Sequence, residues 1–303
     1  MNLGFIREAR APRMKRELHV LKLPPTPNML LLGLTGSIAT GKSTVSSILG
    51  SAPHTLPIID ADILARRVVE PGTPGYKKIV AHFLSTTPDL LLPPSEQDSN
   101  RNGAGSRGQP LNRPALGRRV FGDDSERRRD RAVLNGIVHP AVRKEMYKQI
   151  LYYFFHGYWA VVLDVPLLFE SGLDMMCGTV VVVAVTDPAV QMRRLRARNP
   201  HLSTEDAEQR VRSQGDVGGK AKRAEERGDG AGVVLWNDGT IEELEKEIEA
   251  AMRKVRERSP QWWAWVLLLV PPLAGVIVLL NLYRGWRSKR RWEHEQRQEK
   301  AKQ

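Results

Sequence analysis

Short apolar runs alternate along this chain with longer stretches in which apolar residues recur every three or four positions. Five of the runs have the length and β-branched content of buried strands and cover residues 29–35, 56–62, 159–170, 179–186 and 233–236. Segments with helical spacing lie between or after them, at residues 44–49, 63–69, 192–198 and 241–258. Strands that alternate with helices predict a three-layer α/β fold with a parallel sheet.

A sixth apolar run is much longer than the others. Residues 259–283 contain no charged residue, and tryptophan and tyrosine gather at both ends of the run. About 21 helical residues cross the roughly 30 Å hydrocarbon core of a bilayer, so we expect a C-terminal transmembrane helix over residues 259–284. Pro271 and Pro272 interrupt its helical hydrogen bonds, so the run could be either a kinked span or a re-entrant hairpin. A separate alternative is a buried helix of a soluble domain.

One domain is predicted at residues 29–258. Two further segments flank this domain or the long apolar run, and a third is an insertion within the domain. Residues 1–28 form a basic extension that is either disordered, a transit peptide or an upstream start that is seldom used. Residues 93–110 have almost no apolar content and predict a disordered insertion. Residues 285–303 form a basic tail that would bind anionic headgroups or stay solvated. Basic residues flank the long apolar run on both sides, so its orientation stays open.

Composition adds few constraints to this picture. The 303 residues are 41% hydrophobic and 26% charged, an ordinary balance for one large domain with appendages. The net charge of +12 suits phosphate-rich ligands or an anionic surface, but a sizeable part of it lies in the two terminal segments. No zinc-ligand spacing, aromatic RNA-binding motif or basic recognition helix supports a nucleic-acid partner. The single cysteine, Cys177, excludes an intramolecular disulfide and is expected to be a core residue.

Directly after the first apolar run, residues 36–43 read Gly-Ser-Ile-Ala-Thr-Gly-Lys-Ser, a complete phosphate-binding loop in the required strand–loop–helix context. Backbone N–H groups would bind phosphate oxygens, Lys42 would bridge the β- and γ-phosphates, and the Ser43 hydroxyl would bind Mg²⁺. The ligand is therefore expected to be ATP or GTP. The nucleotide-binding candidates are Gly36, Ser37, Ile38, Ala39, Thr40, Gly41, Lys42, Ser43 and Thr44.

Two carboxylates, Asp60 and Asp62, follow the second apolar run. Ligands of parallel sheets bind at the carboxyl ends of the strands, so both side chains are expected to face the same crevice as the phosphate loop. The alternative is that one of them only caps the following helix.

These residues together resemble the dephospho-CoA kinase family. The resemblance runs from about residue 29 to residue 250 and rests on an ordered set of motifs: residues 34–44, Asp60-Ala61-Asp62 with Ala65-Arg66 and Val69-Glu70-Pro71-Gly72, Leu111-Asn112-Arg113, Leu134-Asn135 with His139-Pro140, residues 165–170, Gln214 with Lys220, and Asn237-Asp238-Gly239. It implies a P-loop kinase fold with a helical substrate domain and a lid. It also implies transfer of the γ-phosphoryl group of ATP to the ribose 3′-hydroxyl of dephospho-CoA.

The resemblance also implies roles for single residues. Asp62 would accept the proton of the 3′-hydroxyl, a contribution typically worth about 10²–10⁴-fold, while Asp60 would hold metal-bound water or orient the sugar; the two roles could be exchanged. Lys42 would neutralise the transferring phosphoryl group, with Mg²⁺ at Ser43. Further expected contacts are Arg66, His139, Pro166 and Leu167 on the dephospho-CoA side and Arg198, Asn237 and Gly239 on the ATP side.

Two other functions stay open from the residues alone. One is a P-loop kinase that acts on another small alcohol or nucleotide. The other is a membrane-tethered nucleotide-binding scaffold without activity, which the intact set of Lys42, Ser43, Asp60 and Asp62 argues against. For the intact chain we expect a cytosol-facing domain anchored in the mitochondrial outer membrane or the endoplasmic reticulum, near other enzymes of coenzyme A synthesis or its consumers.

Overall fold

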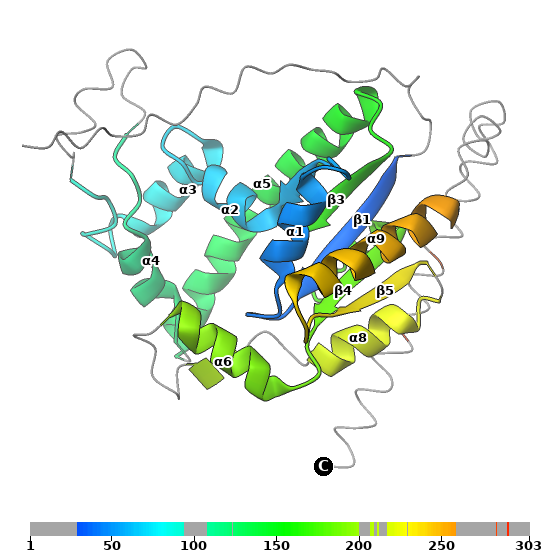
Figure 1. Cartoon of the computed structure of the whole chain (residues 1–303). Helices are drawn as coiled ribbons and strands as arrows, with labels where there is room; N and C mark the ends of the chain where they lie inside the picture. Colours follow the sequence, from blue (N-terminus) through cyan, green and yellow to red (C-terminus); the bar gives the residue numbers. More distant parts are fainter. Residues whose placement is uncertain are drawn as a thin grey trace, which may run out of the picture.

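The computed structural model describes residues 29–93, 108–122, 124–199, 207–208, 211, 217–228, 230–258, 283 and 290. Its centre is a sheet of five parallel strands in the order β2-β3-β1-β4-β5 (Figure 1). The strands are β1 (Leu30–Gly36), β2 (Ile58–Asp60), β3 (Ala160–Asp164), β4 (Thr179–Ala184) and β5 (Gly232–Trp236). The predicted parallel sheet is thus confirmed, although β2 and β3 end earlier than their apolar runs.

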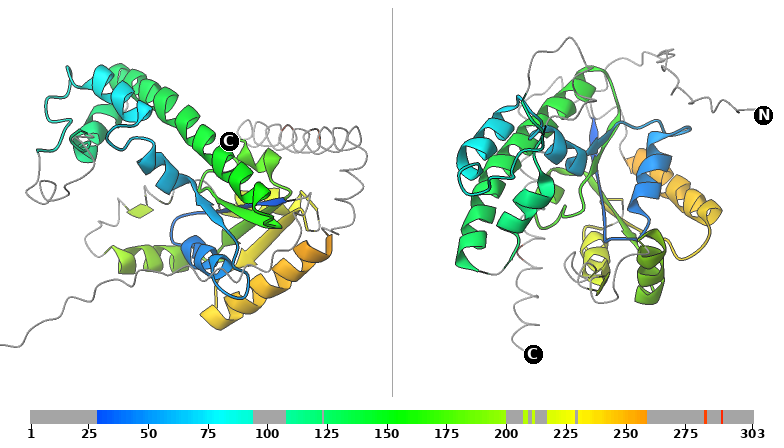
Figure 2. Two further views of the ribbon diagram at one scale, coloured as in Figure 1. Left: turned by 90° about the horizontal axis from the view of Figure 1, so that it is seen from above. Right: turned by 90° about the vertical axis from the view of Figure 1, so that its left-hand side faces the viewer.

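Both faces of the sheet are covered, which explains why the central strands read as unbroken apolar runs. Every residue of β3 and β4 is buried. On one face, α1 (Lys42–Gly50) and α9 (Ile241–Arg258) contribute Val45, Leu49 and Leu244 to the core. On the other face, α5 (Ser125–Phe155) and α8 (Val217–Glu225) contribute Met146 and Ala224. The two views in Figure 2 show these layers.

The predicted helical region is also present. It consists of α2 (Ala61–Arg67), α3 (Pro74–Phe83), α4 (Arg113–Val120) and the first half of α5. The last three share a separate core around Ile79 and Phe83, whereas Leu64 of α2 belongs to the core of the sheet. Side chains cap all four of these helices: the acceptors are Asp60 for α2, Thr73 for α3, Asn112 for α4 and Asp124 for α5. A short helix η1 (Leu173–Met176) precedes β4, and α6 (Pro188–Arg198) follows it.

The segment predicted to be a disordered insertion, residues 93–110, is ordered at both ends. Leu91 and Leu111 form an antiparallel bridge, and the Leu92 N–H donates to the Pro110 carbonyl over 2.9 Å. The Tyr76 hydroxyl donates to the Gln109 carbonyl over 2.7 Å. Apolar residues just outside the insertion and one tyrosine thus hold its ends, while residues 94–107 lie outside the described residues.

The long apolar run at residues 259–284 lies outside the described residues except for Tyr283. Within the described part of the chain, none of the helices combines the length and the apolar character needed to cross a bilayer. The extension at residues 1–28 and all but one residue of the tail at residues 285–303 likewise lie outside the described part.

Candidate active site

The phosphate loop connects β1 to α1 as predicted, and its shape depends on two residues in the left-handed region of backbone space. Ala39 has φ 61° and Gly41 has φ 97°. A Cβ at Gly41 would lie 2.1 Å from the Nδ2 atom of Asn237, so glycine is required there by both backbone and space. The Thr40 hydroxyl donates to the Ser37 carbonyl over 2.9 Å, which closes the loop. The loop therefore ends at the N-terminus of α1, where backbone N–H groups favour phosphate.

Lys42, the first residue of α1, is paired with Asp164 at the end of β3. Its ammonium group donates to Oδ1 of Asp164, and this carboxylate is buried. Burial raises the pKa of the Asp164 carboxyl above its usual value, an effect that the adjacent Lys42 opposes. Lys42 is thus held at the loop by a buried partner. No role was predicted for Asp164 from the sequence, although its place at the end of an apolar run indicated that it lies at the same edge of the sheet as the phosphate loop.

Asp60 lies next to Asp164 in the sheet register, at the end of β2. Its Oδ1 atom accepts hydrogen bonds from the N–H groups of Asp62 (2.8 Å) and Ile63 (3.0 Å), so it caps α2. The predicted cap by Asp60 is therefore present, and it fixes this carboxylate at the edge where the strands end. Asp62 is exposed in the first turn of α2. The sheet thus places the carboxylates of Asp60 and Asp164 side by side, and Asp62 follows Asp60 in the first turn of α2.

Two elements support the phosphate loop from its other side. The side-chain amide of Asn237, after β5, donates to the Thr40 carbonyl over 2.8 Å. Buried Gln191 of α6 donates to the Ile38 carbonyl over 2.6 Å, and Arg194 donates to the Asn237 carbonyl over 2.8 Å. The sequence did not indicate Gln191 or Arg194 because their role depends on where α6 packs. The predicted lid residue Arg198 lies exposed at the end of α6.

The turn after β5 contains Gly239, the third glycine assigned to ATP binding after Gly36 and Gly41. A Cβ at Gly239 would lie 1.8 Å from Oε2 of Glu243, so a larger residue would displace this carboxylate from its hydrogen bond with the Thr240 N–H. Asp238 accepts hydrogen bonds from the backbone and hydroxyl of Thr186, over 2.9 Å and 2.7 Å. The turn is therefore firmly attached to the end of β4.

The residues expected on the acceptor side follow β3. The Pro166 carbonyl accepts hydrogen bonds from the Thr35 hydroxyl (2.8 Å) and from the Lys220 ammonium (3.2 Å). Lys220 is buried and also pairs with Glu170 over 3.3 Å. Leu167 is 46% exposed between these anchored residues. The segment after β3, residues 165–170, which we call the acceptor segment, is thus held to both β1 and α8, with one apolar side chain facing out.

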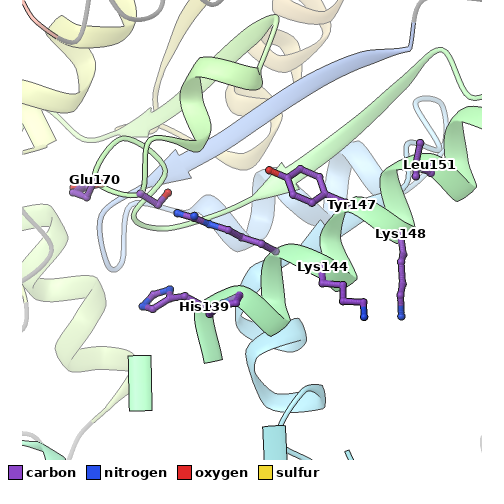
Figure 3. Close-up of a pocket in the computed structure, with 9 residues that line it drawn as sticks. His139, Lys144, Tyr147, Lys148, Leu151 and Glu170 are labelled. Carbon is purple, nitrogen blue, oxygen red and sulfur yellow. The ribbon is translucent and has the colours of Figure 1, made fainter. Parts of the chain in front are cut away.

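A hollow of about 850 Å³ lies between α5 and this segment (Figure 3). His139 and Glu170 line it together, which brings the predicted histidine close to the acceptor segment. Arg66, by contrast, is exposed on α2 and is not among the lining residues. The lining residues are His139, Pro140, Arg143, Lys144, Tyr147, Lys148, Leu151, Glu170 and Ser171.

The candidate metal ligands are few. In the described part of the chain, no three His, Cys, Asp or Glu side chains are grouped as a metal cluster. Ser43, Asp60 and Asp164 instead offer a hydroxyl and two carboxylates near the loop. Such a set of oxygen donors fits Mg²⁺, which is usually bound through one or two carboxylates together with substrate phosphates and water.

Comparisons with known proteins agree with this geometry. The family model for dephospho-CoA kinase (CoaE) matches residues 30–243. Dephospho-CoA kinase CAB5 of Saccharomyces cerevisiae is 43% identical over 82% of this chain and 90% of its own length. Dephospho-CoA kinase of Bacillus cereus is 43% identical over 74% of this chain and 96% of its own length.

A solved structure, TT1252 from Thermus thermophilus, is 28% identical with a TM-score of 0.56 and covers 75% of this chain and 98% of its own. The family match includes the phosphate loop, the carboxylates at the ends of β2 and β3, and the turn after β5. The chain therefore belongs to the dephospho-CoA kinase family.

Proposed function

We propose that this chain is a dephospho-CoA kinase that transfers the γ-phosphoryl group of ATP to the ribose 3′-hydroxyl of dephospho-CoA and so completes coenzyme A synthesis. The main support is the family match over residues 30–243. The geometry agrees with it, because the phosphate loop, three carboxylates and the acceptor segment gather at one edge of the sheet.

On the ATP side, the loop from Gly36 to Thr44 binds the phosphates through backbone N–H groups. Lys42 exchanges part of its contact with Asp164 for the β- and γ-phosphate oxygens. The turn with Asn237 and Gly239 holds the adenine, and Arg198 approaches the phosphates from the lid. These roles follow the family resemblance, and the hydrogen bonds from Asn237 and Gln191 to the loop support its role in holding the phosphates.

Ser43 and Asp164 would bind Mg²⁺ directly or through water, and Asp60 would do so through water. When bound there, the ion would neutralise negative charge on the β- and γ-phosphates, which phosphoryl transfer requires. The protein residues then hold the nucleophile and the leaving group in line.

On the acceptor side, Asp62 accepts the proton of the 3′-hydroxyl and Asp60 orients the sugar. Arg66, Pro166 and Leu167 border the acceptor. His139 belongs to the hollow, whose cationic and apolar lining suits the pyrophosphate and the pantetheine arm of dephospho-CoA.

The test uses the full chain with ATP, Mg²⁺ and dephospho-CoA, and mass spectrometry of the acceptor. We expect a product heavier by one phosphoryl group and a loss of about 10²–10⁴-fold in kcat for Asp62→Asn. The matched control is Asp89→Asn, which alters an exposed carboxylate outside the site. Phosphorylation of a different alcohol with no change to dephospho-CoA would contradict the proposed acceptor, and equal activity of Asp62→Asn would reject its role as base.

We further propose that residues 259–284 anchor the chain in the mitochondrial outer membrane or the endoplasmic reticulum, with the kinase domain in the cytosol near other enzymes of the pathway. The support is the uncharged length of this run and its flanking aromatic and basic residues. Extraction of cell membranes with alkaline carbonate tests it, since release of the intact chain into the supernatant would contradict an anchor.

A further inference from the structure

The outer end of α5 exposes three large apolar side chains, of which Leu151 also lines the hollow. Leu151 is 54% exposed, Tyr152 53% and Phe155 74%. They lie within the last five residues of the helix and form what we call the α5 end patch. Single exposed apolar residues are common, but a cluster of three with two aromatic rings is typical of an interaction surface.

The helix end holds the patch in a defined geometry. The Tyr152 ring lies 3.9 Å, centroid to centroid, from the ring of His156, which contacts the Tyr152 carbonyl through Nδ1 over 2.6 Å. The Phe155 ring packs edge to face on Phe154 at 5.5 Å. Gly157, with φ 76°, then ends the helix. The aromatic rings are therefore presented at a fixed end of the domain.

The C-terminal end of α9 lies at the same end of the domain (Figures 1 and 2). The Arg256 guanidinium stacks on Trp159, 5.0 Å from the ring centroid, and Trp159 directly precedes β3. The Trp159 carbonyl also accepts a hydrogen bond from Leu30 at the start of β1. This end is therefore opposite the catalytic edge, where the parallel strands terminate.

The charge of α9 changes sign along its length. Its first half is rich in glutamate, with Glu242, Glu243, Glu245, Glu247 and Glu249. Its last two turns contain the exposed cations Arg253, Lys254 and Arg256, with Glu257 as the acid among them. Aromatic and cationic side chains are thus combined at one end of the domain.

The chain continues from this same end. Residues 259–283, which follow α9 directly, carry no charge, and Arg284, Arg287, Lys289, Arg290 and Arg291 come after them. The candidate membrane segment therefore begins beside the α5 end patch, one residue after the last residue of α9.

We propose that the α5 end patch and the basic end of α9 form a second membrane contact, which rests the kinase domain on an anionic lipid surface with its catalytic edge pointing away. Aromatic side chains favour the headgroup region, and clustered arginine and lysine favour anionic headgroups. The occupant of the patch is therefore the bilayer. This inference rests on the proposed anchor at residues 259–284.

The test places a fluorescent label in the full chain at Phe155→Cys and reads quenching by nitroxide-bearing lipid. The native Cys177 is 4% exposed and burial raises its pKa to about 12, so the label reports the new cysteine alone. The matched control is Phe121→Cys, another exposed phenylalanine (68%), which lies beside the other end of α5. Vesicles contain either phosphatidylcholine alone or added phosphatidylserine.

We expect the chain to float with both kinds of vesicle. On phosphatidylserine vesicles the label at position 155 should be quenched at least about twofold more than the label at position 121. Arg253→Glu with Lys254→Glu should abolish this difference and leave kinase activity unchanged, since both residues lie far from the site.

Three results would overturn the proposal. They also distinguish failure of the second membrane contact from failure of the proposed anchor at residues 259–284. Flotation with equal quenching at both positions would reject the second contact and keep the anchor. Failure to float would reject both. A lipid-independent disulfide between two chains at position 155 would identify a second copy of the chain as the occupant of the patch.

Discussion

At the scale of single residues, the phosphate loop is supported by a side chain that follows β5, a strand two positions away from β1 in the sheet. Asn237 follows β5, and its side-chain amide reaches the carbonyl of fully buried Thr40. The resemblance assigned Asn237 to adenine binding, and the structure adds this support of the loop. If Asn237 also contacts ATP as predicted, it would couple nucleotide recognition to phosphate positioning.

Asn237→Ala should therefore weaken ATP binding more than turnover. The substitution leaves the Thr40 carbonyl without its partner, and a loss of about 1.4 kcal/mol corresponds to about a tenfold rise in the KM for ATP. The control is Asp238→Ala, which removes an exposed contact to Thr186 instead of a buried contact to the loop. Steady-state kinetics with varied ATP measures both; an equal rise in the two variants would contradict the role of Asn237 in supporting the loop.

The single cysteine was expected to be a core residue, and this is confirmed. Cys177 is buried between β1 and the segment around η1, and burial raises its pKa to about 12. Almost no thiolate is present at pH 8, because the pH lies about four units below the pKa of this thiol. Iodoacetamide at pH 8 should therefore leave the folded chain unmodified and alkylate it in urea, as mass spectrometry would show; rapid alkylation of the folded chain would contradict this burial.

The residues that the sequence predicted and those that it missed differ in a physical way. The phosphate loop, Asp60 and Asp62 could be found because local spacing fixes their position at the end of a strand. Gln191 and Arg194 could not, since only the packing of α6 against the loop gives them contacts. Asp164 is an intermediate case. Its strand was predicted, but its pairing with Lys42 depends on the order of the strands in the sheet, which the sequence does not give.

At the scale of elements, the sequence predicted five strands from their apolar runs, but it could not give their order. Apolar content shows that a strand is buried and does not show which strand is its neighbour. The single helix α5 was also hidden, because Pro140 in its interior ordinarily marks a helix end. Its 31 residues join the helical region to the sheet layer.

Two glycines in these elements should respond to alanine in opposite directions. Gly136 is in α5 with no atom within 4 Å of an added Cβ, so Gly136→Ala should stabilise the fold by about 0.5–1 kcal/mol. Gly33 is in β1, where a Cβ would lie 2.7 Å from Leu168 and 2.8 Å from Cys177. Gly33→Ala should destabilise the fold by about 1–3 kcal/mol. Urea unfolding of both variants provides the measurement, and shifts of the same sign would contradict this packing.

At the scale of the whole molecule, a buried charge network attaches α8 to η1. Asp174 is 2% exposed and pairs with Arg223 over 3.4 Å and with Arg227 over 3.3 Å. Arg223 also lies 4.5 Å from the ring centroid of Phe169, in the acceptor segment. The network therefore connects α8 and η1 to the segment after β3.

Asp174→Ala should destabilise the protein by about 3–5 kcal/mol, because it leaves buried arginine charge without its carboxylate. Asp89→Ala, which removes an exposed ion pair with Arg118, should have almost no effect. Thermal and urea unfolding of the two variants would distinguish them. A small effect of Asp174→Ala would mean that water reaches the two arginines after the change.

The length of α5 has a consequence for the electric field at the active site. His139, at the hollow, lies sixteen residues before Phe155, which corresponds to about 24 Å along the helix. If the α5 end patch rests on lipid, this spacing equals about three Debye lengths at physiological ionic strength, where one Debye length is about 8 Å. The negative surface potential would fall to about one-twentieth over that distance. ATP and dephospho-CoA, both polyanions, would then reach the site almost without repulsion from the membrane that holds the enzyme.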